Sequence, residues 1–184
     1  RSLARLDASA IETLQLAAVT GREFRLEALV ATGAVDEPDL SNQIDQALTI
    51  AVIEPTGVPG QYRFRHAKMQ EALLDGLSTG RRASLHGLIA VAAERRWGAR
   101  TADRASRLAL HFGESASLHP EHVPKAIYYS FLAGTQAEAA AGWSEAVRHY
   151  ARCRELLADA PEAAVREAGV DEADLHILLG RAAK

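Results

Sequence analysis

The sequence predicts a mainly α-helical fold with a single β-hairpin in its first half. Through most of the 184 residues, apolar side chains recur at three- and four-residue spacing, which is typical of amphipathic helices. Residues 51–65 instead combine two β-prone runs with a turn rich in Pro and Gly. Aromatic residues make up only 5%, and Ala and Leu are abundant, which favours helices packed closely through small side chains.

Three short helices are predicted ahead of the hairpin. The first is capped at Asp7 to Ser9 and stops near Gly21, the second ends near Gly33, and the third opens at Pro38 and Asp39. Their apolar stripes are Ile11, Leu14, Ala18 and Val19, then Phe24, Leu26, Leu29 and Val30, then Leu40, Ile44, Ala47 and Leu48.

The hairpin is expected to be the only one in the chain. Residues 61–65 alternate Tyr62 and Phe64 with Arg63 and Arg65, so the rings share one face and the arginines the other. Three short helices followed by a hairpin is the order of elements in a winged helix-turn-helix domain. Residues 1–78 are therefore predicted to form a winged-helix-like unit.

Residues 79–184 are predicted to form helical hairpins. Two helices, from Lys125 to about Ala141 and from Ser144 to about Ala160, are tetratricopeptide-like, and another pair begins near Asp171 after an insertion. The residues that match the repeat spacing are Gly134, Ala146, Tyr150 and Cys153, with Trp143 in the aromatic slot at the turn.

Composition excludes several classes of protein. The formal net charge of −3 gives no general attraction to nucleic acid or to an anionic membrane. No apolar run approaches the roughly 20 residues that span a bilayer, and one cysteine excludes an internal disulfide. We expect a cytoplasmic location and no membrane partner. Because the chain starts without Met and ends inside a helical pattern, we expect it to be part of a larger protein.

Three groups of residues follow one another along the first half of the chain: residues 14–24, Tyr62 to His66 with Ala72-Leu73, and Arg81-Arg82 with Leu85-His86. This series resembles the segment after the ATPase core of signal-transduction ATPases with numerous domains (STAND ATPases). The family includes large ATP-binding LuxR-type transcription regulators and cyclase-coupled ATPases. The resemblance implies an upstream ATPase domain in cis, a winged-helix unit that relays its nucleotide state, and helical repeats that sense a protein or small-molecule effector.

The chain has no Gly-x-x-x-x-Gly-Lys-Ser/Thr loop to cradle phosphates. We therefore expect no cofactor in this chain, with ATP or ADP held by the ATPase domain of the parent protein, and no enzymatic activity. A hydrolase is a third alternative that we do not favour, because Ser84, Ser106 and Cys153 lack a base that the sequence can identify.

His66 is the sharpest candidate site residue. The resemblance implies that a histidine at this place contacts the β-phosphate of ADP, although Ala67 stands where the family motif has Asp. A histidine before a helix can donate to a phosphate while the helix amides add positive potential. The alternative is a capping or packing histidine, and both remain open at this point.

Two further sets of residues are candidates for partner surfaces. Arg63, Arg65, Arg81 and Arg82 form either a docking surface for the ATPase domain or a nucleic-acid patch. We favour docking, and a DNA-binding winged-helix regulator with a helical sensor arm is the alternative function. Tyr128 and Trp143 are candidates for a ligand or partner groove, with the hairpin core as the alternative place for Trp143.

Histidines raise the question of a metal site. No i,i+4 histidine pair with a nearby acid stands on one predicted helix, so we expect no metal and assign the group to the surface. Its members are His86, His111, His119, His122 and His149. The adjacent Tyr128 and Tyr129 point about 100° apart on a helix, so at most one can lie fully inward.

Overall fold

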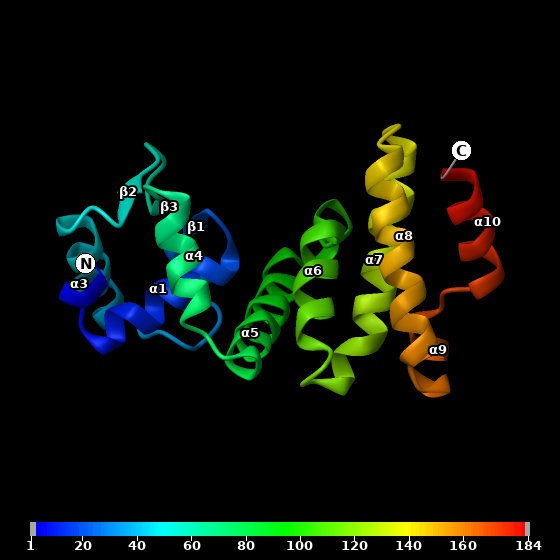
Figure 1. The fold of residues 1–184 in the computed structure, drawn as a ribbon, viewed down its shortest axis with the longest axis horizontal. Coiled ribbons are helices and arrows are strands. Elements are labelled where there is room, and N and C mark those ends of the chain that lie inside the picture. Colours follow the sequence, from blue (N-terminus) through cyan, green and yellow to red (C-terminus); the bar gives the residue numbers. More distant parts are fainter. Residues whose placement is uncertain (1–2, 183–184) are drawn as a thin grey trace. The chain divides into compact units, whose positions relative to one another are not determined.

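The computed structural model describes residues 3–182 and is mainly helical, with a small three-stranded antiparallel sheet (Figure 1). The chain divides into two compact units, the first ending at Arg96 and the second beginning at Trp97. The sequence placed this junction at residues 78 and 79, in front of a helix that the structure assigns largely to the first unit.

The first unit opens with a 3₁₀ turn (Leu3–Arg5) and then alternates helices with short strands. Its elements are α1 (Ala8–Thr20), β1 (Glu23–Arg25), α2 (Leu26–Val30), α3 (Glu37–Thr49), β2 (Ile53–Pro55), β3 (Gln61–Phe64), α4 (Ala67–Asp75) and α5 (Thr79–Trp97).

Helix α1 begins and ends at the predicted residues. The Asp7 side chain accepts a hydrogen bond of 2.7 Å from the Ala10 amide, which satisfies one of the free donors at the helix start. Gly21 ends the helix with φ of 139°, a value that side chains disfavour, and its amide donates to the Ala17 carbonyl.

The sheet corrects the prediction for Phe24 and adds a third strand to the predicted hairpin. β2 and β3 pair as expected, but β1 adds a third strand on the other side of β3, in the order β1-β3-β2. Phe24, predicted to begin the second helix, lies in β1 opposite Tyr62. Its ring packs 5.6 Å from that of Phe64, so burial of aromatic surface and the open edge of β3 together favour a strand here.

A single core explains the later junction between the units. Leu14 of α1, Ile44 of α3 and Phe64 of β3 are almost fully buried in it. Leu85 and Ile89 of α5 join the same cluster. The first part of α5 therefore belongs with the sheet and the preceding helices, which moves the boundary beyond residue 78.

The second unit consists of helices joined by short turns. Its elements are 3₁₀ turns at Gly98–Arg100, Ala102–Arg104 and Pro120–His122, and the helices α6 (Ala105–Ser115), α7 (Val123–Ala139), α8 (Trp143–Asp159), α9 (Glu162–Ala168) and α10 (Glu172–Ala182). The predicted insertion after residue 160 folds as the short helix α9. Asp171 accepts from the Ala173 amide at 2.7 Å and so caps α10, as the sequence indicates.

Helices α7 and α8 pack together over the residues predicted to join them. Tyr150, Cys153 and Ala146 are fully buried, and Ile127 and Leu175 belong to the same cluster. Trp143 was predicted to fill the aromatic slot of this hairpin. That prediction is wrong, since Trp143 opens α8 with 49% of its surface exposed. The buried Tyr150 ring is the aromatic group that packs against Gly134.

Within residues 3–182, none of the helices combines the length and the apolar character needed to cross a lipid bilayer.

Candidate functional site

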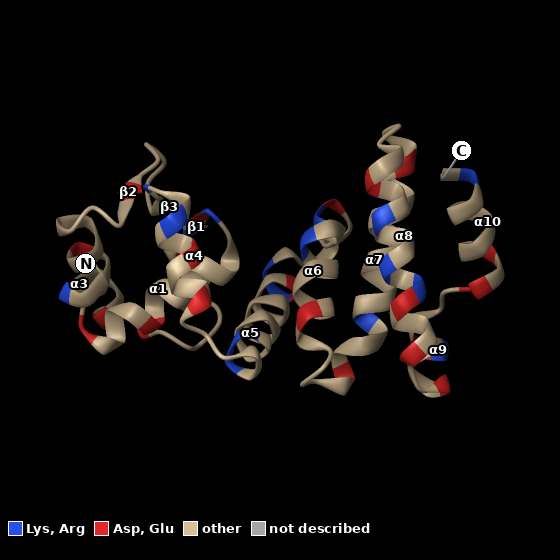
Figure 2. Ribbon diagram, viewed as in Figure 1, with Lys and Arg blue, Asp and Glu red and all other residues tan. Residues whose placement is uncertain are grey.

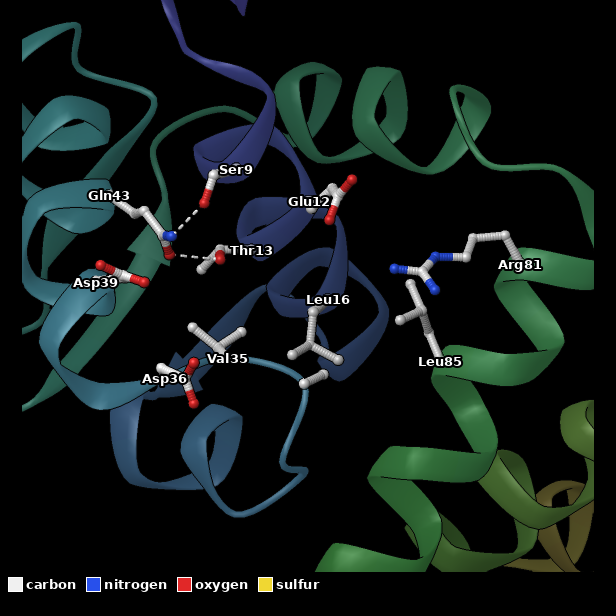
Figure 3. Close-up of a pocket in the computed structure, with 11 residues that line it drawn as sticks. Ser9, Glu12, Thr13, Leu16, Val35, Asp36, Asp39, Gln43, Arg81 and Leu85 are labelled. Carbon is white, nitrogen blue, oxygen red and sulfur yellow. Dashed lines mark hydrogen bonds between the residues drawn. The ribbon is translucent and has the colours of Figure 1, made fainter.

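A pocket of about 140 Å³ lies among α1, the start of α3 and the start of α5 in the first unit (Figure 3). Side chains from three separate stretches of the sequence meet there. The lining residues are Ser9, Glu12, Thr13, Leu16, Ala34, Val35, Asp36, Asp39, Gln43, Arg81 and Leu85.

A hydrogen-bonded chain, buried at Thr13 and Gln43 and exposed at Ser9, forms one wall of this pocket. The Thr13 hydroxyl donates to Gln43 Oε1 at 2.6 Å, and Gln43 Nε2 donates to Ser9 Oγ at 2.5 Å (Figure 3). Thr13 and Gln43 are both more than nine-tenths buried. Since each satisfies the other, the wall avoids the cost of unpaired buried polar groups and fixes α1 against α3.

The remaining polar residues of the pocket are charged. Glu12, Asp36 and Asp39 supply three carboxylates and Arg81 one guanidinium, a net charge of −2. Within the described part of the chain these four side chains make no ion pair and no hydrogen bond with other residues, and Asp36 precedes α3 without capping it through its side chain. Their charges are therefore available to a ligand.

Of the predicted basic residues, only Arg81 lines the pocket. Arg63 on β3 instead pairs with Glu54 on β2, with its Nε and Nη2 each 2.7 Å from the same carboxylate oxygen. Arg65 and Arg82 are exposed and lie outside the pocket lining. Arg81 and Arg82 lie on α5, along which Figure 2 shows further basic residues.

His66 lies where the sequence predicts, immediately before α4. It is exposed, and its side chain makes no capping hydrogen bond to the helix. The capping and packing alternative therefore finds no support. The contact with a nucleotide phosphate stays a prediction.

The exposed aromatic residues of the second unit do not share one groove. Tyr128 is 47% exposed and Tyr129 is 5% exposed and stacks on Phe112, which confirms that only one of the adjacent tyrosines points inward. Tyr128 precedes the end of α7 by 11 residues, a rise of roughly 16 Å, whereas Trp143 follows the turn at that end. Tyr128 and Trp143 are therefore two separate candidates for contact with a partner or ligand.

Three of the histidines assigned to the surface are buried, so that prediction is wrong for His86, His111 and His122. His122 Nδ1 lies 2.8 Å from the Ser115 hydroxyl, which itself donates to the Phe112 carbonyl. The histidine thus acts as a packing element between α6 and the start of α7. No cluster of three or more His, Cys, Asp or Glu side chains within residues 3–182 is arranged to hold a metal ion.

One pair of residues with catalytic potential escaped the sequence reasoning. Ser106 Oγ on α6 lies 3.2 Å from His149 Nε2 on α8, and burial lowers the pKa of that imidazole, with Arg148 adding to the effect. Glu145 approaches the same nitrogen at 3.8 Å. A catalytic carboxylate holds the opposite ring nitrogen, so these three side chains do not form a triad. Their separation of 43 residues left no sequence signal.

Comparison with known proteins gives no family: no family model, no curated protein and no solved structure gives a significant match to the chain. The functional argument therefore depends on the residues themselves.

Proposed function

We propose that this chain is a non-catalytic regulatory and protein-interaction segment of a cytoplasmic multidomain signalling ATPase, in a transcription regulator. In this proposal the first unit is a winged-helix-like element that docks on the ATPase domain and relays its nucleotide state. The second unit is tetratricopeptide-like and presents a surface to a protein or a small effector. The relay is a population shift between two arrangements that differ in their contacts.

The observation that carries the proposal is the charge of α3. The element order helix, strand, two helices and two strands, with β1 beside β3, is compatible with a winged helix. In such domains the second helix of the helix-turn-helix enters the major groove. Here that helix is α3, which holds Glu37, Asp39 and Asp45 and has no Lys or Arg. Carboxylates on this helix repel DNA phosphates, which supports docking on protein over reading of DNA.

The hairpin supports the same choice. The side chain of Arg63, which would contact phosphates from a DNA-binding wing, is paired with Glu54 of the neighbouring strand. Exposed ion pairs contribute only about 0–1 kcal/mol to stability, so this pair alone does not decide between docking on protein and binding to DNA. Together with the acidic α3, it favours a hairpin whose charges are balanced within the protein.

The second unit supports a role in binding through its exposed rings. Tyr128 on α7 and Trp143 on α8 each expose about half of their surface. Tyr and Trp are enriched where proteins bind partners, because they offer a large apolar area with a polar handle.

The test is to purify the natural protein that contains this chain and to identify its polypeptides and bound nucleotide by mass spectrometry. We expect a phosphate-loop ATPase in the same polypeptide, retained ADP, and faster ADP loss in His66→Ala than in the control His176→Ala. A polypeptide without such an ATPase contradicts the proposal. Equal ADP loss in both variants rejects the role of His66 alone.

A further inference from the structure

We propose that the pocket among α1, α3 and α5 binds a free basic amino acid of the lysine class. Such a ligand carries one carboxylate and two ammonium groups. The inference concerns the first unit by itself and does not depend on the proposed function.

The distribution of charge in the pocket carries the argument. In Figure 3 Asp36 and Asp39 lie on one side, and Arg81 and Glu12 lie on the other. One side is thus purely acidic, and the other holds one charge of each sign. An ammonium group suits the Asp36 and Asp39 side, whereas the α-ammonium and α-carboxylate of an amino acid suit Glu12 and Arg81.

The middle of the pocket is apolar. Leu16 and Val35 lie between the two charged sides (Figure 3), and Leu85 lines the wall on α5. A chain of methylene groups between the two charged ends of a ligand would bury its apolar surface against these residues. An acidic amino acid would bring a second carboxylate to Asp36 and Asp39 and is therefore excluded.

The size of the pocket agrees with a ligand of this class. About 10–15 Å³ of such space accommodates one water molecule, so the pocket of about 140 Å³ has room for on the order of ten non-hydrogen atoms. This is well below the roughly 300–1,000 Å³ of pockets for drug-sized ligands. A free amino acid with a long side chain fills the available space.

The pocket is prepared for a ligand before binding. The hydrogen bonds of Gln43 to Thr13 and Ser9 fix its wall, so binding does not have to order that wall. Asp36 is the residue immediately before α3 and Asp39 lies in the first turn of that helix. Since both carboxylates lack a partner among the described residues, a cation does not have to displace one.

The experiment is isothermal titration calorimetry on the 184-residue chain with four ligands. We expect L-lysine to bind one to one, with a dissociation constant of about 1 mM or tighter. Norleucine lacks the terminal ammonium and cadaverine lacks the carboxylate, and each should bind at least about tenfold more weakly. L-Glutamate should give no heat of binding. Absence of lysine binding at a concentration of about 10 mM overturns the proposal.

Matched variants locate the site. Asp39→Asn and Arg81→Gln should each weaken lysine binding about tenfold or more, whereas Asp45→Asn on the same helix and the neighbouring Arg82→Gln should leave it unchanged. Circular dichroism establishes that each variant is folded, and Glu12→Gln replaces any variant that is not. Equal binding by pocket variants and controls overturns the proposal. Cadaverine binding as tightly as lysine rejects the amino acid class.

Discussion

Gly134 of α7 lies directly against the ring of Tyr150 of α8. A Cβ atom placed on Gly134 would stand 2.5 Å from Cδ1 of that ring, closer than real Cβ atoms approach, and 3.0 Å from Cζ. Tyr150 is fully buried, and its hydroxyl donates to Glu138 Oε2 at 2.9 Å. The ring therefore has little room to move, and the close approach of the two helices depends on the missing side chain of Gly134.

Substitution of Gly134 by Ala should destabilise the protein by about 1–3 kcal/mol, because the added methyl group overpacks the contact with Tyr150. Ala is a better helix former than Gly by up to about 1 kcal/mol. The substitution should therefore destabilise the protein even though helix propensity alone would stabilise it. Urea denaturation followed by circular dichroism measures the change in the free energy of unfolding.

Gly180→Ala in α10 is the matched control. A Cβ atom there meets nothing within 4 Å, so only the gain in helix propensity remains. We expect a change between zero and about 1 kcal/mol of added stability. Equal effects of the two substitutions would show that the contact with Tyr150 does not limit packing.

Glu138 links three helices of the second unit and should make stability depend on pH. It accepts from Arg181 Nε at 2.5 Å and from the Tyr150 hydroxyl. The hydrogen bond from Arg181, aided by that from Tyr150, lowers the pKa of Glu138 below its ordinary value of 4.5. A carboxyl group whose pKa falls on folding adds stability above the unfolded pKa, and this stability is lost as the pH drops through the folded pKa.

The expected result is a fall in the melting temperature as the pH drops from about 5 to about 3, steeper in the wild type than in Glu138→Gln. Glu145→Gln serves as the control, since Glu145 is an exposed acid of the same unit. Parallel pH profiles for the wild type and Glu138→Gln would contradict the role of this carboxylate.

Helix ends and strand alternation could be predicted from the sequence, because each depends on residues that are neighbours in the chain. The cap at Asp7, the stop at Gly21 and the alternation of Tyr62 with Arg63 each depend on a few adjacent positions, and the structure confirms all three. Gly134 and Tyr150 were predicted to belong to one pair of packed helices, and the structure adds that they contact each other directly. Interactions within a few turns of backbone can be read in this way.

Long-range pairing could not be predicted. β1 is three residues long, and two of them are charged, so only its pairing with β3 some 40 residues later makes it a strand. The pocket combines α1, α3 and α5, and Ser106 meets His149 across 43 residues. Burial of His122 likewise depends on its partner Ser115 and on tertiary packing. Such contacts follow from how the elements pack, which the spacing of residues in one sequence does not determine.

The buried bond between Thr13 and Gln43 should show strong coupling. Thr13→Val leaves Gln43 Oε1 without its donor, and Gln43→Met leaves the Thr13 hydroxyl without its acceptor. Each change should cost about 1–3 kcal/mol, because one buried polar group stays unsatisfied. The double variant should cost less than the sum by about 0.5–3 kcal/mol.

The control cycle combines Thr13→Val with Gln46→Met, because Gln46 bonds to the exposed Asp7 and not to Thr13. The changes in the free energy of unfolding caused by these two substitutions should be additive. If the effects of Thr13→Val and Gln43→Met are also additive, the predicted coupling between Thr13 and Gln43 is refuted. The four proteins of each cycle are compared by urea denaturation.

The acidic α3 should prevent DNA binding at physiological salt. Electrophoretic shift assays with duplex DNA should give no complex at about 150 mM salt with up to about 10⁻⁴ M protein. Replacement of Glu37, Asp39 and Asp45 by their amides should increase the weak binding seen at low salt. A complex of the wild type that persists at 150 mM salt would favour the DNA-binding alternative instead.

Cys153 should report the opening of the second unit. Burial raises the pKa of this fully buried thiol to about 12 from an ordinary 9.0, and its Sγ lies 3.6 Å from the Ile127 carbonyl. At pH 8 this lowers the thiolate fraction roughly a thousandfold, and the thiolate is the reactive species. A thiol reagent should therefore label the native protein far more slowly than the protein in urea.

The same reaction tests the packing of α7 on α8. If the label enters only after local opening, Gly134→Ala should speed labelling about tenfold for each 1.4 kcal/mol of lost stability, because Cys153 lies one helical turn from Tyr150. Gly180→Ala should not. Rapid labelling of the native wild type would show that Cys153 is accessible without opening and would contradict the buried position of its thiol.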